Sequence, residues 1–251
     1  MSFEADAKAN AKRGKKRAKA SLGDDGGRKK KGKAKAEERV DRRAPLPVRN
    51  KKRELVFEGH PEFRPNLTPK QIMQMGSFGG TYFRPIKSSV TNKSYTKAWE
   101  EFPEDWFEGL NITTQVASRT YEKALNKFGV KCGGSLDMWE SSGWIVEQDP
   151  YGWFQWYCRF YLGRRTDDDD RQIGRGNRAI GLLSTSPLFF QSAGPTGRFR
   201  TQLMNKVIKN NTTYNDPSVS PVIRQTLQHW GYELTEEDFI MYLKQKGFDG
   251  S

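Results

Sequence analysis

Three points along the chain combine a helix-capping residue with a proline, and each predicts the first turn of a helix. These dipeptides are Thr68-Pro69, Asp149-Pro150 and Ser220-Pro221. Ser, Thr and Asp side chains accept hydrogen bonds from the free N–H groups of a helix start, and proline suits the first helical position because it has no N–H. In the first case Gln71 stands three residues after Thr68, as in a capping box, and Gly76 predicts the end of the helix.

Apolar residues at helical spacing, bounded by caps and glycines, predict helices in five segments. The segments are 94–102, 118–129, 135–143, 220–231 and 235–247. In 220–231 we expect Val222, Leu227 and Trp230 to face the core. Only 80–86 and 143–148 resemble strands, which predicts at most a small two-stranded ribbon. The predicted fold class is therefore mostly α: a compact helical domain with no internal repeats.

The segment Tyr151–Tyr161 places seven aromatic side chains in eleven residues. On a helix that begins at Pro150, one face carries Trp153, Trp156, Tyr157, Phe160, Tyr161 and Arg164. With Phe154 and Cys158 beside that face, the apolar surface nearly encircles the helix, which indicates a central core helix. An alternative is a platform on which nucleic-acid bases stack, favoured by the flanking arginines Arg159, Arg164 and Arg165. No cofactor motif accompanies these rings.

Four consecutive aspartates, 167–170, precede a series of arginines. Carboxylates are favourable at the positive end of a helix dipole, so the run predicts a helix start. The arginines Arg171, Arg175 and Arg178 then share one basic face, a candidate contact for nucleic acid. Two alternatives remain open. The aspartates could ligate Mg²⁺, although adjacent carboxylates are more typical of caps and surface ion pairs, or they could pair internally with Arg164 and Arg165.

A second basic segment covers 194–211. Arg198, Arg200, Lys206 and Lys209 accompany an apolar stripe at helical spacing, and a Gly-Pro-Thr-Gly sequence precedes them. Free backbone N–H groups at such a helix start suit a phosphate. The segment lacks a phosphate-loop consensus, so the pattern indicates a phosphate contact weakly.

The distribution of charge divides the chain at residue 53. The whole chain has a formal net charge of +13; residues 1–53 contain 20 Lys/Arg and seven Asp/Glu, and residues 54–251 contain 23 of each sign. Residues 1–53 hold a single aromatic residue, Phe3, and too few apolar residues to offset the ordering cost of about 1–2 kcal/mol per residue. We therefore predict a disordered basic tail and linker over 1–53 and one helical domain over 54–251.

Two lysine-rich clusters, at 12–20 and 28–36, predict a polyanionic partner or an import receptor for the tail. Such segments bind polyanions by releasing condensed counterions, and importin-type receptors recognise similar runs. A solvated tail without function is the alternative. The residues predicted to contact nucleic acid are Lys12, Arg13, Lys15, Lys16, Arg17, Arg28, Lys29, Lys30, Lys31, Arg159, Arg164, Arg165, Arg171, Arg175, Arg178, Arg198 and Arg200.

The chain offers few residues for catalysis. It contains two histidines, His60 and His229, and two cysteines, Cys132 and Cys158, without a CxxC or His-rich pattern. This predicts reduced thiols in an intracellular protein, with no metal and no cofactor. His229 is interpreted as an interior or surface residue rather than a base. No apolar run approaches the roughly 20 residues that cross a bilayer, so no membrane partner is predicted.

Three segments together resemble an uncharacterised family found mainly in algae, other protists, fungi and large DNA viruses. They are GSFGGTYFRPI (76–86), DPYGWFQWYCRFYLGRR with the following DDRQIGR (149–175), and SPVIRQTLQHWGYELTEEDF (220–239). The resemblance covers most of 57–240. It implies a shared fold and no named activity, so no functional residue is carried over.

One segment departs from that family pattern. Family members pass from an RQIxRW sequence to GPxGRFR within a few residues, whereas here 176–193 intervenes and Gly176 replaces the expected Trp. The segment is apolar, lacks helical periodicity and contains Pro187. We predict an insertion that forms an exposed loop, with a retained intron or a gene-model error as one origin to test by transcript reads across it.

The function predicted from these observations is a nuclear, nucleic-acid-associated binding protein without catalysis of its own. Two alternatives stay open. The first is a nucleic-acid repair or modification enzyme that holds a base on the aromatic helix beside an acid such as Asp149 or Glu140. The second is a protein-interaction module whose tail is a nuclear import signal.

Overall fold

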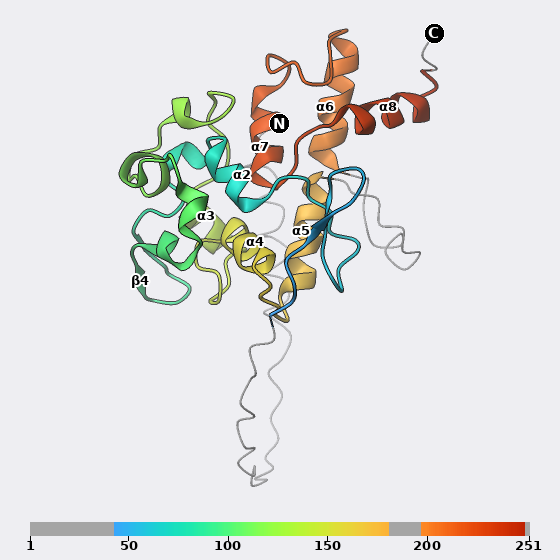
Figure 1. Cartoon of the computed structure of the whole chain (residues 1–251). Helices are drawn as coiled ribbons and strands as arrows, with labels where there is room; N and C mark the ends of the chain where they lie inside the picture. Colours follow the sequence, from blue (N-terminus) through green and yellow to red (C-terminus); the bar gives the residue numbers. More distant parts are fainter. Residues whose placement is uncertain (1–42, 181–196, 249–251) are drawn as a thin grey trace, which may run out of the picture.

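The structure is a computed structural model that describes residues 43–180 and 197–248, and these residues form a mostly helical fold (Figure 1). The α-helices within them are α2 (Pro69–Gln74), α3 (Leu136–Ser141), α4 (Trp153–Tyr161), α5 (Asp169–Ile180), α6 (Arg198–Lys209), α7 (Pro221–His229) and α8 (Glu236–Gln245). The predicted fold class is confirmed. No helix in the described part of the chain is long and apolar enough to span a bilayer.

The β-structure in the described residues consists of two short antiparallel ribbons. Strand β1 (Val48–Arg49) pairs with β2 (Leu55–Val56), and β3 (Ile86–Lys87) pairs with β4 (Ser94–Tyr95). The predicted strand at 80–86 contributes only its last residue to β3. The predicted strand at 143–148 is reduced to an isolated bridge between Val146 and Asp149.

Helix starts follow the predicted caps at four of the expected positions. The Thr68 hydroxyl accepts from the Gln71 N–H and the Gln71 side chain accepts from the Thr68 N–H, so the capping box of α2 is complete. Ser135 caps α3 and Thr235 caps α8 through their hydroxyls. Helix α7 begins at Pro221 as predicted, but its cap residue Ser220 has a left-handed backbone and makes no capping hydrogen bond.

Two predicted helices are wrong. In 118–129 only Lys123–Leu125 forms a single 3-10 turn, and in 94–102 the strand β4 precedes a 3-10 turn over Ala98–Glu101. Helix α4 also begins three residues later than predicted, at Trp153 after Gly152. Gly152 has φ +90°, and the Tyr151 N–H donates to the side chain of Gln155, so the turn before α4 is not helical.

Helix α4 is the centre of the larger of two hydrophobic clusters. Trp156, Tyr157 and Phe160 are fully buried, and Trp153 is 7% exposed. Their rings pack against one another and against Phe63. The predicted core helix is confirmed: Trp156, Tyr157 and Phe160 are enclosed by other side chains and offer no face to a base, whereas Trp153 and Phe154 also line a cavity described below.

The smaller hydrophobic cluster joins the C-terminal helices. It contains Ile180 of α5, Leu203 and Val207 of α6, and Leu227 of α7. In Figure 1, α6, α7 and α8 lie together at one end of the molecule, and α2, α3 and α4 lie on the other side of α7. Val222, expected in the core, is 46% exposed.

The folded part begins earlier than the predicted boundary at residue 54. The Ala44 N–H donates to the carbonyl of Gly163 at 2.9 Å. A few residues later, strand β1 pairs with β2. The Arg49 guanidinium donates to the carbonyl of Asn66 and the side chain of Gln71. Residues 43–53 are therefore part of the domain, while 1–42 lie outside the described residues.

The predicted insertion at 176–193 is also corrected at its start. Residues 176–180 continue α5 as regular helix, and Gly176, Ala179 and Ile180 are buried. An exposed loop beginning at Gly176 is therefore wrong. The rest of the predicted insertion, 181–193, lies outside the described residues.

Candidate functional site: an aromatic cavity with four cations

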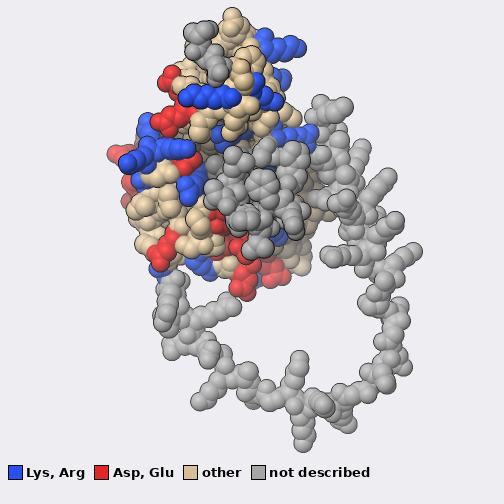
Figure 2. All heavy atoms as spheres, turned by 90° about the vertical axis from the view of Figure 1, so that its right-hand side faces the viewer, with Lys and Arg blue, Asp and Glu red and all other residues tan. Residues whose placement is uncertain are grey.

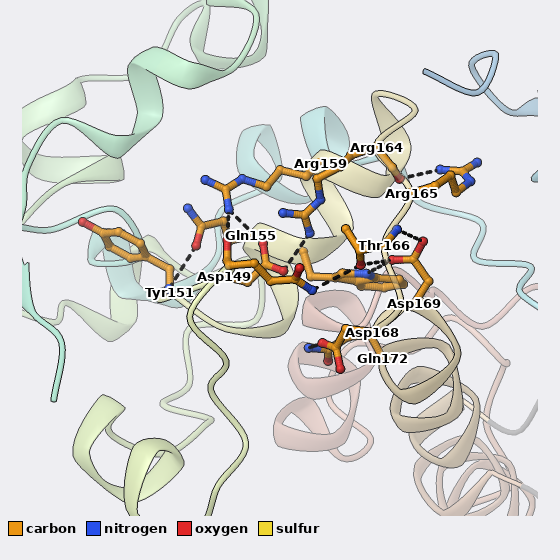
Figure 3. A network of polar contacts seen from close by, with 12 residues as sticks. Asp149, Tyr151, Gln155, Arg159, Arg164, Arg165, Thr166, Asp168, Asp169 and Gln172 are labelled. Atoms are coloured by element: carbon orange, nitrogen blue, oxygen red, sulfur yellow. Dashed lines mark hydrogen bonds and ion pairs between the residues drawn. The ribbon is translucent and has the colours of Figure 1, made fainter. Parts of the chain in front are cut away.

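Two of the arginines predicted to bind nucleic acid instead neutralise a buried carboxylate (Figure 3). Asp149 is fully buried, and its two oxygens lie 3.0 Å from Arg159 Nη1 and 2.7 Å from Arg164 Nη2. Arg159 also forms two hydrogen bonds of 2.6 Å with Glu101. These ion pairs connect the turn before α4 with its last turns, so Arg159 and Arg164 are structural cations and their prediction as phosphate contacts is not supported by their position.

The alternative in which Arg164 and Arg165 form ion pairs with the aspartate run is not what the structure shows: Arg164 pairs with Asp149, and Arg165 has only a longer-range attraction to Asp169. Arg165 lies over the ring of Phe160, 3.9 Å from the ring centroid, and donates to the carbonyls of Phe160 and Arg164. Within the run, Asp169 is buried and accepts from the Trp156 indole N–H at 2.9 Å and the Thr166 N–H at 2.8 Å. Asp169 therefore fixes the start of α5, as the helix-start prediction required.

The three arginines of α5 do not form the predicted common basic face. Arg171 forms an ion pair with Asp168 one turn before it, with Nη2 2.8 Å from a carboxylate oxygen. Arg178 is exposed. Arg175 turns inward, where Nη1 donates to the Trp144 carbonyl at 3.1 Å and to the Gln172 side chain at 3.0 Å.

The second predicted patch, on α6, is partly neutralised. Arg200 Nη2 lies 2.8 Å from Asp238 of α8, and its guanidinium lies 5.4 Å from the Tyr232 ring centroid. Arg198 is exposed in the first turn of α6. Figure 2 shows Lys and Arg side chains spread over this end of the molecule, with Asp and Glu among them. The nine predicted contacts between Lys12 and Lys31 lie outside the described residues.

A cavity of about 410 Å³ lies between α3, α7, the start of α4 and the middle of α5. Its wall is largely aromatic, with contributions from segments far apart in the sequence. The rings lining it are those of Phe78, Tyr82, Tyr121, Trp139, Trp144, Tyr151, Trp153, Phe154 and Trp230. Trp139, Trp144, Trp230 and Tyr121 are partly exposed, so their rings are accessible to a ligand in the cavity.

Four cations line the same cavity: Arg84, Arg119, Lys131 and Arg175. None of the described residues that line it is Asp or Glu. Arg119 and Lys131 are exposed, which places them at the mouth, whereas Arg84 and Arg175 are partly buried. This combination of accessible tryptophans and excess positive charge suits a ligand that carries both a flat apolar group and an anion.

Arg175 is the cation most in need of a counter-ion. Burial, together with the positive charges of Arg171 and Arg178, lowers the pKa of its guanidinium to about 10, although Asp168 acts in the opposite direction. Among the residues that the structure describes, no carboxylate forms an ion pair with Arg175; its side chain lies near the rings of Trp144 and Trp230 instead. A pKa of about 10 leaves this guanidinium charged at neutral pH, so an anion bound in the cavity would neutralise a partly desolvated positive charge.

The cavity also brings together a cysteine and a histidine whose proximity the sequence did not indicate. Cys132 Sγ lies 3.3 Å from His229 Nδ1, and both residues line the cavity. His229 Nε2 accepts from the Phe78 N–H at 3.1 Å, so in the neutral ring the proton is on Nδ1 and points to the sulfur. Burial raises the pKa of the Cys132 thiol to about 12 and lowers the pKa of His229 to about 3.

These directions keep both groups neutral, and the pair is therefore not an activated nucleophile. A catalytic cysteine needs a lowered pKa and a base with a free lone pair facing the thiol. The acids considered for an enzyme are also elsewhere: Asp149 is paired with two arginines, and Glu140 accepts from Ser88 and Ser89. Neither acid lines the cavity.

Of the residues predicted from the sequence to contact nucleic acid, only Arg175 lines this cavity. The sequence predicts it on an exposed basic face with Arg171 and Arg178, not in a cavity wall. The remaining lining residues come partly from helices α3, α4 and α7 and partly from loops without periodicity, such as 78–86, 119–135 and 144–151. A local signal did exist in the Cys-Gly-Gly-Ser sequence at 132–135, because glycines allow the backbone to pass close to aromatic rings. Gly133 has φ +88°, and a Cβ on Gly134 would lie 1.9 Å from the end of the Met138 side chain and 3.1 Å from the Trp139 ring nitrogen.

Comparison with known proteins identifies no relative: no family model, no curated protein and no solved structure matches the chain. The arguments for function therefore come from the cavity and from the charge distribution.

Proposed function

We propose that this protein is a non-catalytic nucleic-acid-binding protein whose cavity holds one unpaired nucleotide of a strand. The observation that supports it is the coincidence, in one cavity, of partly exposed tryptophans with four cations and no lining carboxylate among the described residues. A nucleotide has the matching chemistry, since its base is flat and its phosphate is an anion.

The aromatic wall supplies affinity without sequence preference. Base stacking on an aromatic side chain contributes about 1–3 kcal/mol for each base, and every base has a face that can stack. The three tryptophans Trp139, Trp144 and Trp230 combine partial exposure with a position on the cavity wall. The volume of about 410 Å³ lies within the range of roughly 300–1,000 Å³ that small ligands occupy.

In this proposal two of the four cations bind the backbone of the nucleic-acid strand outside the cavity, and the other two bind the phosphate inside it. Arg119 and Lys131 at the mouth contact the strand's backbone, and Arg84 and Arg175 inside the cavity receive the phosphate of the bound nucleotide. Desolvated arginines bind phosphate strongly because the guanidinium can donate two parallel hydrogen bonds. Arg175 is already fixed by the Trp144 carbonyl, which reduces the entropy lost on binding.

The basic residues before the domain extend the contact. Residues 1–42 contain 15 Lys/Arg and seven Asp/Glu. In this proposal they neutralise further phosphates and add affinity without reading sequence, and the clusters at 12–20 and 28–36 also direct the protein to the nucleus. Binding by the whole chain then depends more steeply on salt than binding by the domain.

The test compares binding of fluorescent single-stranded DNA, single-stranded RNA and free mononucleotides to three forms of the protein. The forms are the full chain, a chain lacking residues 1–42, and that shorter chain with Arg175→Gln. We expect the shorter chain to bind strands with a shallower salt dependence, and Arg175→Gln to weaken binding at least tenfold. Arg178→Gln is the matched control, because it removes an exposed arginine of the same helix that does not line the cavity.

The choice of ligands and protein forms distinguishes a strand-binding cavity from a nucleotide-binding cavity and from binding by the tail alone. Equal binding of mononucleotides and strands would identify a free nucleotide as the ligand. Loss of all nucleotide and strand binding on deletion of 1–42 would overturn the cavity proposal, and it would leave a protein-interaction module with a basic import tail. Equal losses in Arg175→Gln and Arg178→Gln would also contradict a role for the cavity.

A further inference from the structure

A second group of potential ligands lies outside the cavity, on the surface between the loop after β2 and the first turn of α5. His60, Glu62 and Asp170 each direct a ligand atom to one place, and these atoms all lie within 4.8 Å of one another. The sequence separates the first two residues from the third by more than one hundred positions, so only the fold brings them together. We propose that this group is a binding site for a divalent transition-metal ion of the zinc class.

The ligand types fit such an ion. An imidazole nitrogen with two carboxylate oxygens is a donor set that Zn²⁺ accepts at about 2.0–2.2 Å from each atom, which places neighbouring ligand atoms at roughly 3.3–3.6 Å in a tetrahedron. His60 Nδ1 and Glu62 Oε1 already lie 3.5 Å apart. Three protein ligands leave at least one coordination position open to water or to another donor.

The position of the histidine is fixed before any ion binds. The His60 N–H donates to the Phe57 carbonyl and the His60 carbonyl accepts from the Phe63 N–H, which form a tight turn. The imidazole packs edge-on against Phe160 of the core helix α4, with centroids 5.2 Å apart. Pre-organisation of this kind reduces the entropy lost on metal binding.

The two acids have few competing partners. Glu62 is bound to α5 through its carbonyl, which accepts from the Asn177 side chain at 3.2 Å. Asp170 is exposed in the first turn of α5. In the part of the chain that the structure describes, neither carboxylate forms an ion pair with Lys or Arg. An ion would thus connect the β2 loop to α5 without displacing an existing ion pair.

This proposal does not rest on the nucleotide cavity, and its test uses zinc alone. We would titrate metal-free, tag-free full-length protein with ZnCl₂ by calorimetry and repeat the titration with His60→Ala, Glu62→Gln and Asp170→Asn. The expected result is one ion per chain, with the affinity at least tenfold lower in each of the three variants. Far-UV circular dichroism verifies that the variants remain folded.

Two controls distinguish this site from adventitious binding. Asp167→Asn removes an exposed acid from the same aspartate run without touching the group, and Cys132→Ser removes the thiol beside His229. Both variants are expected to bind zinc as the natural sequence does. Loss of binding in Cys132→Ser, unchanged binding in His60→Ala, or no binding at millimolar zinc would each overturn the proposal.

Discussion

Cys132 Sγ and His229 Nδ1 lie 3.3 Å apart on the wall of the cavity, with the imidazole proton between them and the thiol still protonated. The distance is that of a nucleophile and its base, but the direction of the hydrogen bond is reversed. His229 Nε2 accepts from the Phe78 N–H and lies 3.1 Å from the Gln225 side-chain nitrogen, so presenting an Nδ1 lone pair to the sulfur would require a proton on Nε2, which would then face the Phe78 N–H. The pair is therefore a structural contact in the wall of the cavity.

The first prediction concerns the reactivity of Cys132. Because its thiol pKa is raised to about 12, almost no thiolate forms near pH 8, and we expect iodoacetamide to modify it more than tenfold more slowly in the folded than in the unfolded protein. Mass spectrometry of the labelled peptide measures both rates. Labelling of the folded protein at the rate of an unfolded cysteine would instead indicate an activated thiolate.

A second prediction follows from His229, whose pKa is lowered to about 3 by burial. Below about pH 6.5 the His229 side chain binds a proton in the unfolded chain but stays neutral in the folded chain. Protonation of the unfolded chain therefore lowers the free energy of unfolding as the pH falls from about 6.5 towards 3, and His229 makes no pH-dependent contribution above that range. The expected slope approaches about 1.4 kcal/mol for each pH unit between these values.

Urea unfolding at pH 7 and pH 5 measures that slope. His229→Gln should unfold at lower urea than the natural sequence at pH 7, because it loses the stack on Phe78, yet it should lose less stability on acidification. Parallel losses in the two proteins would show that His229 is protonated in the folded state.

A third prediction tests the ion pairs of Asp149. Removing its charge leaves Arg159 and Arg164 partly buried without that partner, and breaking a buried pair from one side costs about 3–5 kcal/mol. We expect Asp149→Asn to lower the free energy of unfolding by this amount. Glu101→Gln is the control: it breaks a pair with the same Arg159, but the Glu101 side chain is 42% exposed, so its cost should stay below about 1 kcal/mol.

The ion pairs of Asp149 are one example of a feature that depends on the tertiary fold and could not be predicted from the sequence. Caps, glycines and apolar spacing are local signals, so they located α2, α3, α7 and α8 and identified α4 as the core helix. The partner of an arginine depends on the tertiary fold, so the sequence could not indicate that Arg159 and Arg164 share Asp149 or that Arg175 faces a cavity. The segment 118–129 has helical spacing yet forms loop with one 3-10 turn, because the N–H groups of Ser118, Glu122 and Lys127 donate to carbonyls of residues 76–80 rather than along a helix.

The fourth prediction places the start of the folded domain between residues 43 and 54. The turn at Gly163 has φ +95°, and a Cβ there would lie 2.2 Å from the Ala44 carbonyl oxygen, so the two segments are in close contact. Deletion of residues 1–42 should leave the thermal midpoint unchanged. Deletion of 1–53 also removes β1 and the Arg49 hydrogen bonds, and it should lower the midpoint by several degrees. Equal midpoints for the two truncated proteins would restore the boundary at residue 54.

The last prediction compares two glycines of α5 that are one half-turn apart. Both have helical backbones, where alanine is about 1 kcal/mol more favourable than glycine. At Gly174 a Cβ would meet the flexible end of Arg178 at 3.5 Å, an ordinary contact, so Gly174→Ala should stabilise the protein by up to about 1 kcal/mol.

At Gly176 the same methyl group would lie 3.1 Å from the Trp153 ring and 3.3 Å from the Phe63 ring. Neither ring can move away easily. The Trp153 indole N–H donates to the Gln172 carbonyl at 2.9 Å, and Phe63 is fully buried among other side chains. Overpacking of a core costs about 1–3 kcal/mol, so Gly176→Ala should destabilise the protein despite its better helix propensity. Urea unfolding of the two variants should give shifts of opposite sign. A stabilising Gly176→Ala would mean that these rings can move, and a tryptophan at this position would then also become compatible with the fold.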